Sequence, residues 1–176
     1  MNLLFKKFLL VVLAASFTGT INAQNAQQEA NLKAAFIYNF TKYIDWDGYG
    51  RDSIFTIGVA GDSPIIESLN AIAAGSKINN KRIVVKKIMS GAEIPDCDIL
   101  FISKNCRLSL NYILTKIKPG ELTVSEQPGF AEAGTAFNFV VINNRLKFEA
   151  NLKAIASAGL KAGAQLLKLA IIADQH

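Results

Sequence analysis

The sequence contains one histidine, His176, which is the last of its 176 residues. Histidine is the commonest general base in enzymes and a frequent zinc ligand. With a single histidine at the last position, we expect neither His-dependent catalysis nor a usual zinc site. Four motifs are also missing: the G-x-S-x-G nucleophile elbow, the C-x-x-C pair, the P-loop and the H-E-x-x-H metalloprotease motif. We therefore expect a protein that is not an enzyme and that uses no metal or cofactor.

Cysteine is scarce as well, with only Cys97 and Cys106 present. A disulfide between them is allowed if the protein is exported, because exported proteins meet an oxidising environment. The segment 98–102 is expected to be a strand, which would hold the two Cα atoms further apart than the ~7 Å that a disulfide permits. Two interpretations stay open: a disulfide formed by a chain that turns back after Ile102, or two separate buried thiols.

Long apolar runs are rare, and the longest one lies near the N-terminus. Lys6 and Lys7 precede an almost wholly apolar segment, 8–17, and small and polar residues then lead to Ala23. This order is typical of a secretory signal peptide, and the apolar run is too short to span ~30 Å of hydrocarbon. We therefore expect residues 1–23 to be a signal peptide, cleaved after Ala23, and the mature chain to reach the periplasm.

The remaining residues, 24–176, have the length of one domain with a core of its own. Its 17 basic residues outnumber its 14 acidic residues by three, because two of the 19 basic residues leave with the signal peptide. Nucleic-acid-binding domains carry a denser basic stripe, so we expect no nucleic-acid partner. No second long apolar run occurs, so we expect no membrane insertion of the mature chain.

Strand and helix patterns alternate along the mature chain. The expected strands are 55–60, 83–88, 98–102 and 122–125, with a β-hairpin that joins 137–142 to 145–149 through Asn143-Asn144. The expected helices are 32–44, 64–75, 108–117 and 151–174, the last interrupted where Gly159 forms a left-handed C-cap. This order predicts an α/β fold: a single-domain α/β sandwich with a mixed, mostly parallel sheet flanked by helices, followed by a C-terminal hairpin and helices.

The stretch Leu32–Trp46 is rich in aromatic residues and shows a helical period. At 100° per residue its large apolar side chains form one face about 140° wide, as expected for a face buried on a sheet. These side chains are Leu32, Phe36, Ile37, Phe40, Tyr43 and Ile44. Tyr38 falls on the other side and Trp46 follows the helix end. These two residues are our candidate interaction surface for a protein partner.

Gly61, Asp62 and Ser63 lie where a strand ends and a helix begins. A helix N-terminus carries free N–H groups and a partial positive charge, so these three residues are our candidate binding site for an anionic ligand. A simpler interpretation is that Asp62 or Ser63 caps those N–H groups itself. In that case the segment has a purely structural role.

Five stretches, which together cover nearly the whole mature chain, resemble the YfiR-like family of small periplasmic regulators. They are LKAAFIYNFTKYIDW at 32–46, FTIGVAGDSPI at 55–65, INNKRIVVKKI at 78–88, CDILFIS at 97–103 and LTVSEQPGFAEAGTAFNFVVINNRLKFEANLKAIASAGLKAGAQLLKLA at 122–170. The resemblance implies an α/β sandwich without enzymatic activity, and it implies that a homodimer is common. Well-known members carry four cysteines in two disulfides. Cys97 matches a family cysteine, but the expected partner region, 55–59, has none here.

The resemblance also implies a function. YfiR-like regulators bind and repress the periplasmic sensor domain of a membrane diguanylate cyclase, which controls cyclic-di-GMP and biofilm formation. An OmpA-like outer-membrane lipoprotein relieves the repression by sequestering the regulator, and relatives act on sensor histidine kinases instead. We therefore carry two hypotheses: a regulator that binds another protein through an exposed apolar patch, or a sensor that binds a small ligand near Gly61–Ser63.

Overall fold

A computed structural model describes the chain in three segments, with side chains from Gln24 onward: residues 18–46, 53–89 and 93–173. The predicted signal peptide lies mostly outside these segments. The first described helix, α2 (Thr18–Phe40), runs through the predicted cleavage position after Ala23. Cleavage there would remove no buried residue of α2 among those described, because the first buried residue of the helix is Ala30.

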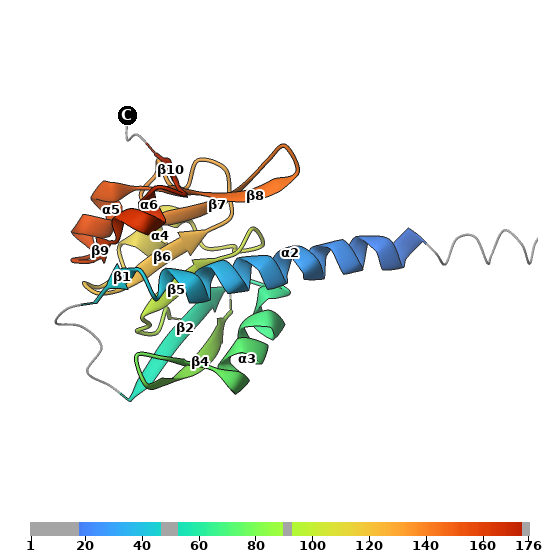
Figure 1. Cartoon of the computed structure of the whole chain (residues 1–176), viewed down its shortest axis with the longest axis horizontal. Helices are drawn as coiled ribbons and strands as arrows, with labels where there is room; N and C mark the ends of the chain where they lie inside the picture. The colour runs from blue at the N-terminus through green and yellow to red at the C-terminus, as the bar shows by residue number, and fades with distance from the viewer. Residues whose placement is uncertain (1–17, 47–52, 90–92, 174–176) are drawn as a thin grey trace, which may run out of the picture.

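The protein is built around a mixed sheet of eight strands in the order β10-β8-β7-β6-β5-β2-β4-β3 (Figure 1). The strands are β2 (Ile54–Ala60), β3 (Lys77–Ile78), β4 (Lys81–Ile88), β5 (Ile99–Ile102), β6 (Leu122–Ser125), β7 (Phe137–Ile142), β8 (Arg145–Ala150) and β10 (Ile171–Ile172). From β4 through β2, β5 and β6 to β7 all neighbours are parallel, whereas β3–β4 and β7–β8 are antiparallel. The predicted α/β fold with a mixed, mostly parallel sheet is confirmed.

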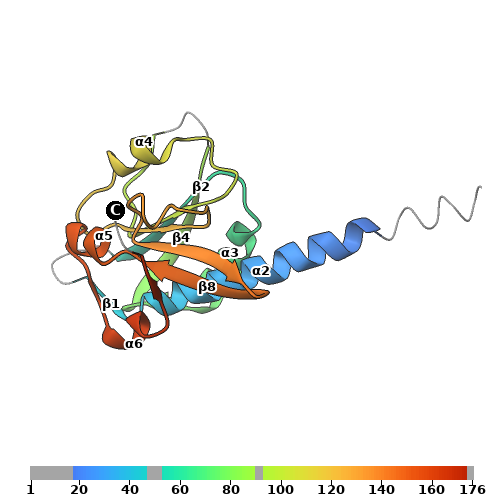
Figure 2. The same cartoon turned by 90° about the horizontal axis from the view of Figure 1, so that it is seen from above.

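Helices cover both faces of the sheet. Helices α2 and α3 (Ile65–Gly75) lie on one face, and α4 (Leu110–Leu114) lies on the other (Figure 2). The side chains of β5 show why: Ile99 and Phe101 belong to the larger core with α2 and α3, and the alternate residues of β5 pack with α4 in a smaller core. A strand that is apolar at every position needs cover on both sides.

The buried face of α2 differs from the predicted face. Ala30, Ala34, Ile37 and Phe40 are buried, whereas Leu32 is 47% exposed. The true buried face is therefore rotated by about 70° from the predicted one. The helix also ends at Phe40 instead of residue 44, and the following strand β1 (Ile44–Asp45) pairs with β9 (Lys161–Ala162). Large apolar residues alone do not locate the face, because small residues let the helix approach the sheet closely.

The predicted β-hairpin of β7 and β8 is confirmed. Asn143 and Asn144 have φ angles of 51° and 57°, and Ile142 pairs with Arg145. A two-residue loop with two positive φ angles is a type I′ turn, whose twist matches that of the flanking strands. Asparagine tolerates this conformation better than most residues, so the sequence placed the hairpin correctly.

The segment 151–174, predicted to be mainly helical, is only partly so. It holds two short helices, α5 (Leu152–Ser157) and α6 (Ala164–Leu167), together with β9 and β10. The predicted C-cap at Gly159 is confirmed: Gly159 has φ 72°, and Leu160 N donates to Ile155 O at 3.1 Å. The last helix continues for one turn only, because β9 and β10 take part in strand pairing on either side of it.

Among the helices that the structure describes, none is both long enough and apolar enough to span a membrane.

The rotated face of α2 makes a stability prediction. Ile37→Ala should lower the free energy of unfolding by about 3 kcal/mol, because the side chain is fully buried and its removal leaves a cavity. Leu32→Ala, which the sequence pattern would rank as equally costly, should cost less than about 1 kcal/mol. Urea denaturation of both variants measures the difference. Equal losses would contradict the observed orientation of α2.

Candidate functional site

The carboxyl ends of the parallel strands form the edge at which α/β sheets usually bind ligands. Strand β2 is the point where the topology reverses, because its neighbours β4 and β5 lie on opposite sides of it. The connection after β2 leads to α3 on one face, and the connection after β5 leads to α4 on the other. Gly61–Ser63 follow β2 and Ser103–Cys106 follow β5, so these two loops flank the expected crevice.

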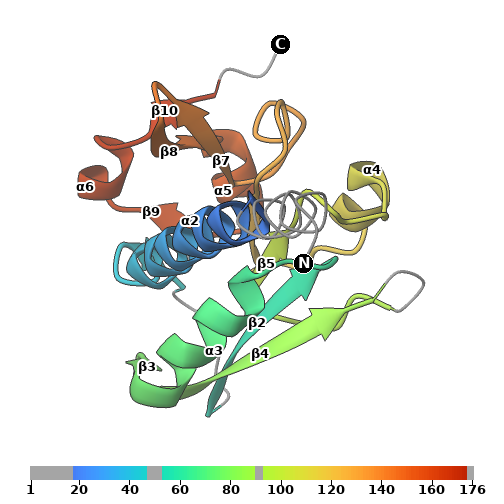
Figure 3. The ribbon, with the colours of Figure 1, turned by 90° about the vertical axis from the view of Figure 1, so that its right-hand side faces the viewer.

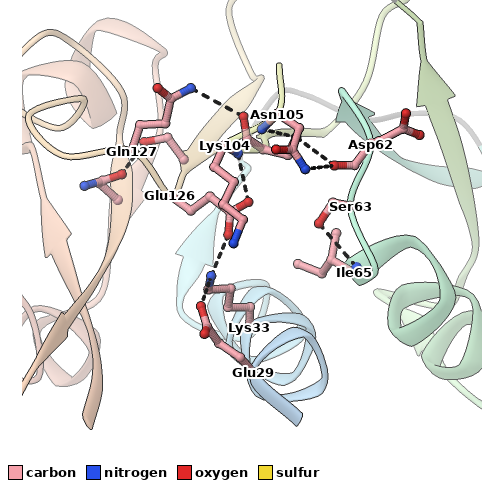
Figure 4. A network of polar contacts seen from close by, with 12 residues as sticks. Glu29, Lys33, Asp62, Ser63, Ile65, Lys104, Asn105, Glu126 and Gln127 are labelled. Atoms are coloured by element: carbon pink, nitrogen blue, oxygen red, sulfur yellow. Dashed lines mark hydrogen bonds and ion pairs between the residues drawn. The ribbon is translucent and has the colours of Figure 1, made fainter. Parts of the chain in front are cut away.

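The crevice between the two loops is filled by the chain itself. Asn105 Nδ2 donates to Asp62 O at 2.9 Å, and Ser103 Oγ donates to the same carbonyl at 3.4 Å (Figure 4). Gly61 has φ 88°, and a Cβ atom there would lie 2.7 Å from Cys106 N. The loops are therefore packed too closely for a ligand to enter between them.

The predicted anion site at Gly61, Asp62 and Ser63 is occupied by contacts within the chain. Ser63 Oγ accepts a 3.4 Å hydrogen bond from Ile65 N, the first residue of α3, whereas Pro64 occupies the N-cap position and α3 has no side-chain cap there. The exposed carboxylate of Asp62 forms an ion pair with Lys87. The hydrogen bond and charge of Lys87 lower the pKa of Asp62, so the carboxylate stays negative and repels an anion.

A buried ion pair joins α2 to the end of β6. Lys33 Nζ lies 2.5 Å from Glu126 Oε2, and the two side chains are only 9% and 6% exposed. Glu29 pairs with Lys33 from the preceding turn of the helix, and Lys104 N donates to Glu126 Oε1 at 2.9 Å. Burial lowers the pKa of Lys33, but hydrogen bonds and charges from Glu126 and Glu29 outweigh it and raise the pKa. Figure 4 shows the network between α2 and the two loops.

A hollow of about 280 Å³ lies beside this ion pair, between α2 and the β7–β8 hairpin. We call it the hairpin groove, and its lining residues are Glu29, Lys33, Lys104, Glu126, Pro128, Phe139, Val140, Val141 and Leu146. Val141 is 59% exposed, and its neighbour Ile142 is also exposed. The charges of the two basic and two acidic side chains in the groove sum to zero. Exposed apolar side chains beside polar ones are a composition that protein–protein interfaces also have.

The predicted interaction surface at Tyr38 and Trp46 is wrong for Trp46. Its side chain is 8% exposed, its Nε1 donates to Gly120 O at 3.0 Å, and its ring meets Phe55 edge-on at 5.6 Å. The chain turns after α2 and carries Trp46 back into the core. Tyr38 is half-buried, with Lys42 Nζ 4.9 Å from its ring centre. The two residues therefore form no common exposed patch.

Cys97 and Cys106 are both free thiols, so of the two interpretations the disulfide is wrong; the thiols are separate, Cys97 is buried and Cys106 is only partly buried. Cys97 lies before β5 and Cys106 lies after it, and the strand separates them. Burial, and then the charge of Glu121, raise the pKa of Cys97 to about 12. A thiol that stays protonated in the core is a packing residue and a poor nucleophile.

Across residues 18–46, 53–89 and 93–173, no group of three or more histidine, cysteine, aspartate or glutamate side chains could hold a metal ion. His176 lies outside these residues. The residues that sequence reasoning missed are Lys33, Glu126 and Val141. The spacing of Glu29 and Lys33 indicates a helical ion pair, but nothing local points to Glu126, which lies 93 positions further along the chain.

The buried ion pair predicts a loss of stability on Glu126→Gln. Removing one charge leaves Lys33 buried without its main partner, which should lower the free energy of unfolding by about 3 kcal/mol at neutral pH. Because the pKa of Lys33 is raised, its stabilisation is complete below the ordinary value of 10.5 and is lost only as the pH rises through the higher folded value. Denaturant unfolding at pH 7 and at increasingly alkaline pH measures both effects.

The matched control is Asp96→Asn, which breaks the exposed ion pair between Asp96 and Lys118. Exposed pairs are screened by water, so this variant should unfold almost as the unaltered protein does. If both variants behaved alike, the Lys33–Glu126 pair would not hold α2 to the sheet.

Comparison with known proteins supports the resemblance seen in the sequence. No curated protein sequence matches the chain. The model of the YfiR/HmsC-like family matches residues 30–171, which is most of the chain; the match begins within α2 and ends at the first residue of β10. The chain therefore belongs to the YfiR/HmsC-like family, whose members are periplasmic regulators of cyclic-di-GMP signalling and are not enzymes.

Proposed function

We propose that this protein represses a membrane diguanylate cyclase by binding its periplasmic sensor domain. The family supports a regulator of cyclic-di-GMP signalling. The hairpin groove supports binding by surface contact, because exposed apolar side chains beside a buried ion pair offer a firm surface that a partner can cover. The groove is the surface that we assign to the cyclase.

The observation that carries this proposal is the exposure of Val141, which lies in the β7–β8 hairpin close to its turn. Val141 lies on β7, which is held by β8 on one side and by β6 near its start on the other. A large apolar side chain on such an element loses little entropy when a partner covers it. The family also suggests a sensor histidine kinase, an OmpA-like lipoprotein or a second copy of the chain as partners for the same surface.

A small-ligand sensor is the second candidate function, and one hollow favours it. Outside the closed crevice lies a hollow of about 720 Å³ whose three basic side chains, Lys87, Lys104 and Arg107, outnumber its single acidic side chain, Asp62. An anionic metabolite is the class of ligand that these charges suit. A rise in the melting temperature with such an anion, together with the absence of any cyclase contact, would favour this second function.

Binding of the cyclase can be tested directly. Val141→Asp should weaken the binding of the purified sensor domain at least about tenfold, because a carboxylate at the centre of an apolar contact must be desolvated. Isothermal titration calorimetry with the mature protein measures the affinity. The variant should fold normally, because the side chain at this position is already largely in water.

The control for this test is Leu169→Asp, at an apolar residue that is 70% exposed and lies in the chain just before β10. It should bind the sensor domain like the unaltered protein. Equal weakening by both variants, or unchanged affinity for Val141→Asp, would place the contact outside the hairpin groove.

Export to the periplasm makes a separate prediction. The protein recovered from a periplasmic extract should begin at Gln24, because the signal peptidase is expected to cut after Ala23. Intact-mass spectrometry gives the position of the cut. A protein found only in the cytosol with residues 1–23 attached would contradict the periplasmic function.

A further inference from the structure

Strand β4 has a free edge. On its inner side it pairs with β2 along its whole length from Arg82. On its outer side β3 pairs only with Lys81 and Arg82, so the outer edge beyond Arg82 has no strand beside it among the described residues (Figure 3). The two end strands, β3 and β10, each pair with their neighbour at two residues only, so the outer edges of β4 and β8 are both largely uncovered by strands.

The backbone groups of this edge point outward at alternate residues. Arg82 N donates to Ser53 O and Ile88 O accepts from Gly61 N, so both of these residues bond inward toward β2. In a parallel pair, successive residues bond to opposite sides, so the N–H and C=O groups of Val85 and Lys87 face away from the sheet. Neither residue is buried. These four groups can pair with an added strand.

A hollow of about 720 Å³ lies against the same strand, on the face away from α3. Its walls come from β4, from β2 and from the residues around Asp96 and Glu121, and the β4 residues are Arg82, Val84 and Lys86. Strand addition gains affinity from backbone hydrogen bonds and specificity from pockets for alternate side chains. The free edge of β4 and the hollow beside it supply both requirements.

The charge of the edge indicates the partner. Strands β3 and β4 carry five basic residues and no acidic residue, the basic ones being Lys77, Lys81, Arg82, Lys86 and Lys87. Two copies of this edge would bring like charges together, which is how natural edge strands avoid pairing with themselves. An extended segment with acidic side chains would instead be attracted to the basic residues of the edge, of which Lys87 already pairs with Asp62.

We propose that the outer edge of β4 binds an extended acidic segment of another protein, which adds to the sheet as a further strand. This surface is distinct from the hairpin groove, so the inference goes beyond the proposed contact with the cyclase sensor domain. A protein with both surfaces can hold the cyclase and receive a second partner at the same time.

The test uses the mature protein and a blocked eight-residue peptide that alternates valine with aspartate. Amide hydrogen exchange by NMR reads out the pairing residue by residue. In the free protein the amides of Val84 and Lys86 should exchange slowly, because they bond to β2, and those of Val85 and Lys87 should exchange quickly. The peptide should slow exchange at Val85 and Lys87 at least about tenfold. Binding that leaves these two amides unchanged would overturn the proposal, as would no binding.

Two variants separate this edge from general attraction between charges. Lys86→Glu should weaken peptide binding at least about tenfold at low salt, whereas Lys153→Glu, at an exposed lysine of α5, should leave it almost unchanged. A peptide with lysine in place of aspartate should not bind. Equal effects of the two variants would overturn the proposal.

A second copy of the chain is the alternative occupant of this edge. Slow exchange at Val85 and Lys87 that appears without peptide and grows with protein concentration would show that a second copy fills the edge, which also overturns the proposal.

The Val141→Asp variant tests whether peptide binding at β4 is independent of the proposed contact with the cyclase. It should bind the acidic peptide normally while losing the cyclase sensor domain, because the hairpin groove and the edge of β4 share no residue. Failure of one interaction can therefore be distinguished from failure of the other.

Discussion

The packing of α2 across the sheet is the contact on which the other features depend. Phe40 stacks on Phe137 at 4.6 Å and meets Phe148 edge-on at 5.0 Å, so the helix is held against β7 and β8. About two turns earlier, Lys33 reaches Glu126 just after the end of β6. The aromatic cluster supplies the apolar burial and the ion pair fixes the register, since a buried charge tolerates few alternative positions.

Two surfaces of opposite character follow from this arrangement. The hairpin groove has balanced charges and an apolar wall, whereas every charged residue of β3 and β4 is basic. The crevice at which α/β sheets usually bind ligands is closed by Asn105 and Asp62. A regulator needs contacts that a partner can make and break, and exposed surfaces provide these better than a deep pocket does. The fold thus favours recognition of other proteins over chemistry on a substrate.

Local patterns predicted the elements of the fold well. The Asn143-Asn144 turn, the Gly159 cap and the apolar strand β5 each follow from the conformational preference of a few adjacent residues. The candidate site was predicted less well because it depends on contacts between distant parts of the chain. Trp46 was expected on the surface because it follows the helix, yet the turn after Phe40 carries it inward. The partner of Lys33 is 93 positions away and no periodicity reveals it.

The most direct test of this account is the rate at which open membrane fragments containing the cyclase make cyclic-di-GMP, with and without the purified mature protein. The account predicts that the rate falls as the protein is added, and that Val141→Asp does not lower it at the same concentration. An unchanged rate under conditions where the unaltered protein is bound to the cyclase would contradict it.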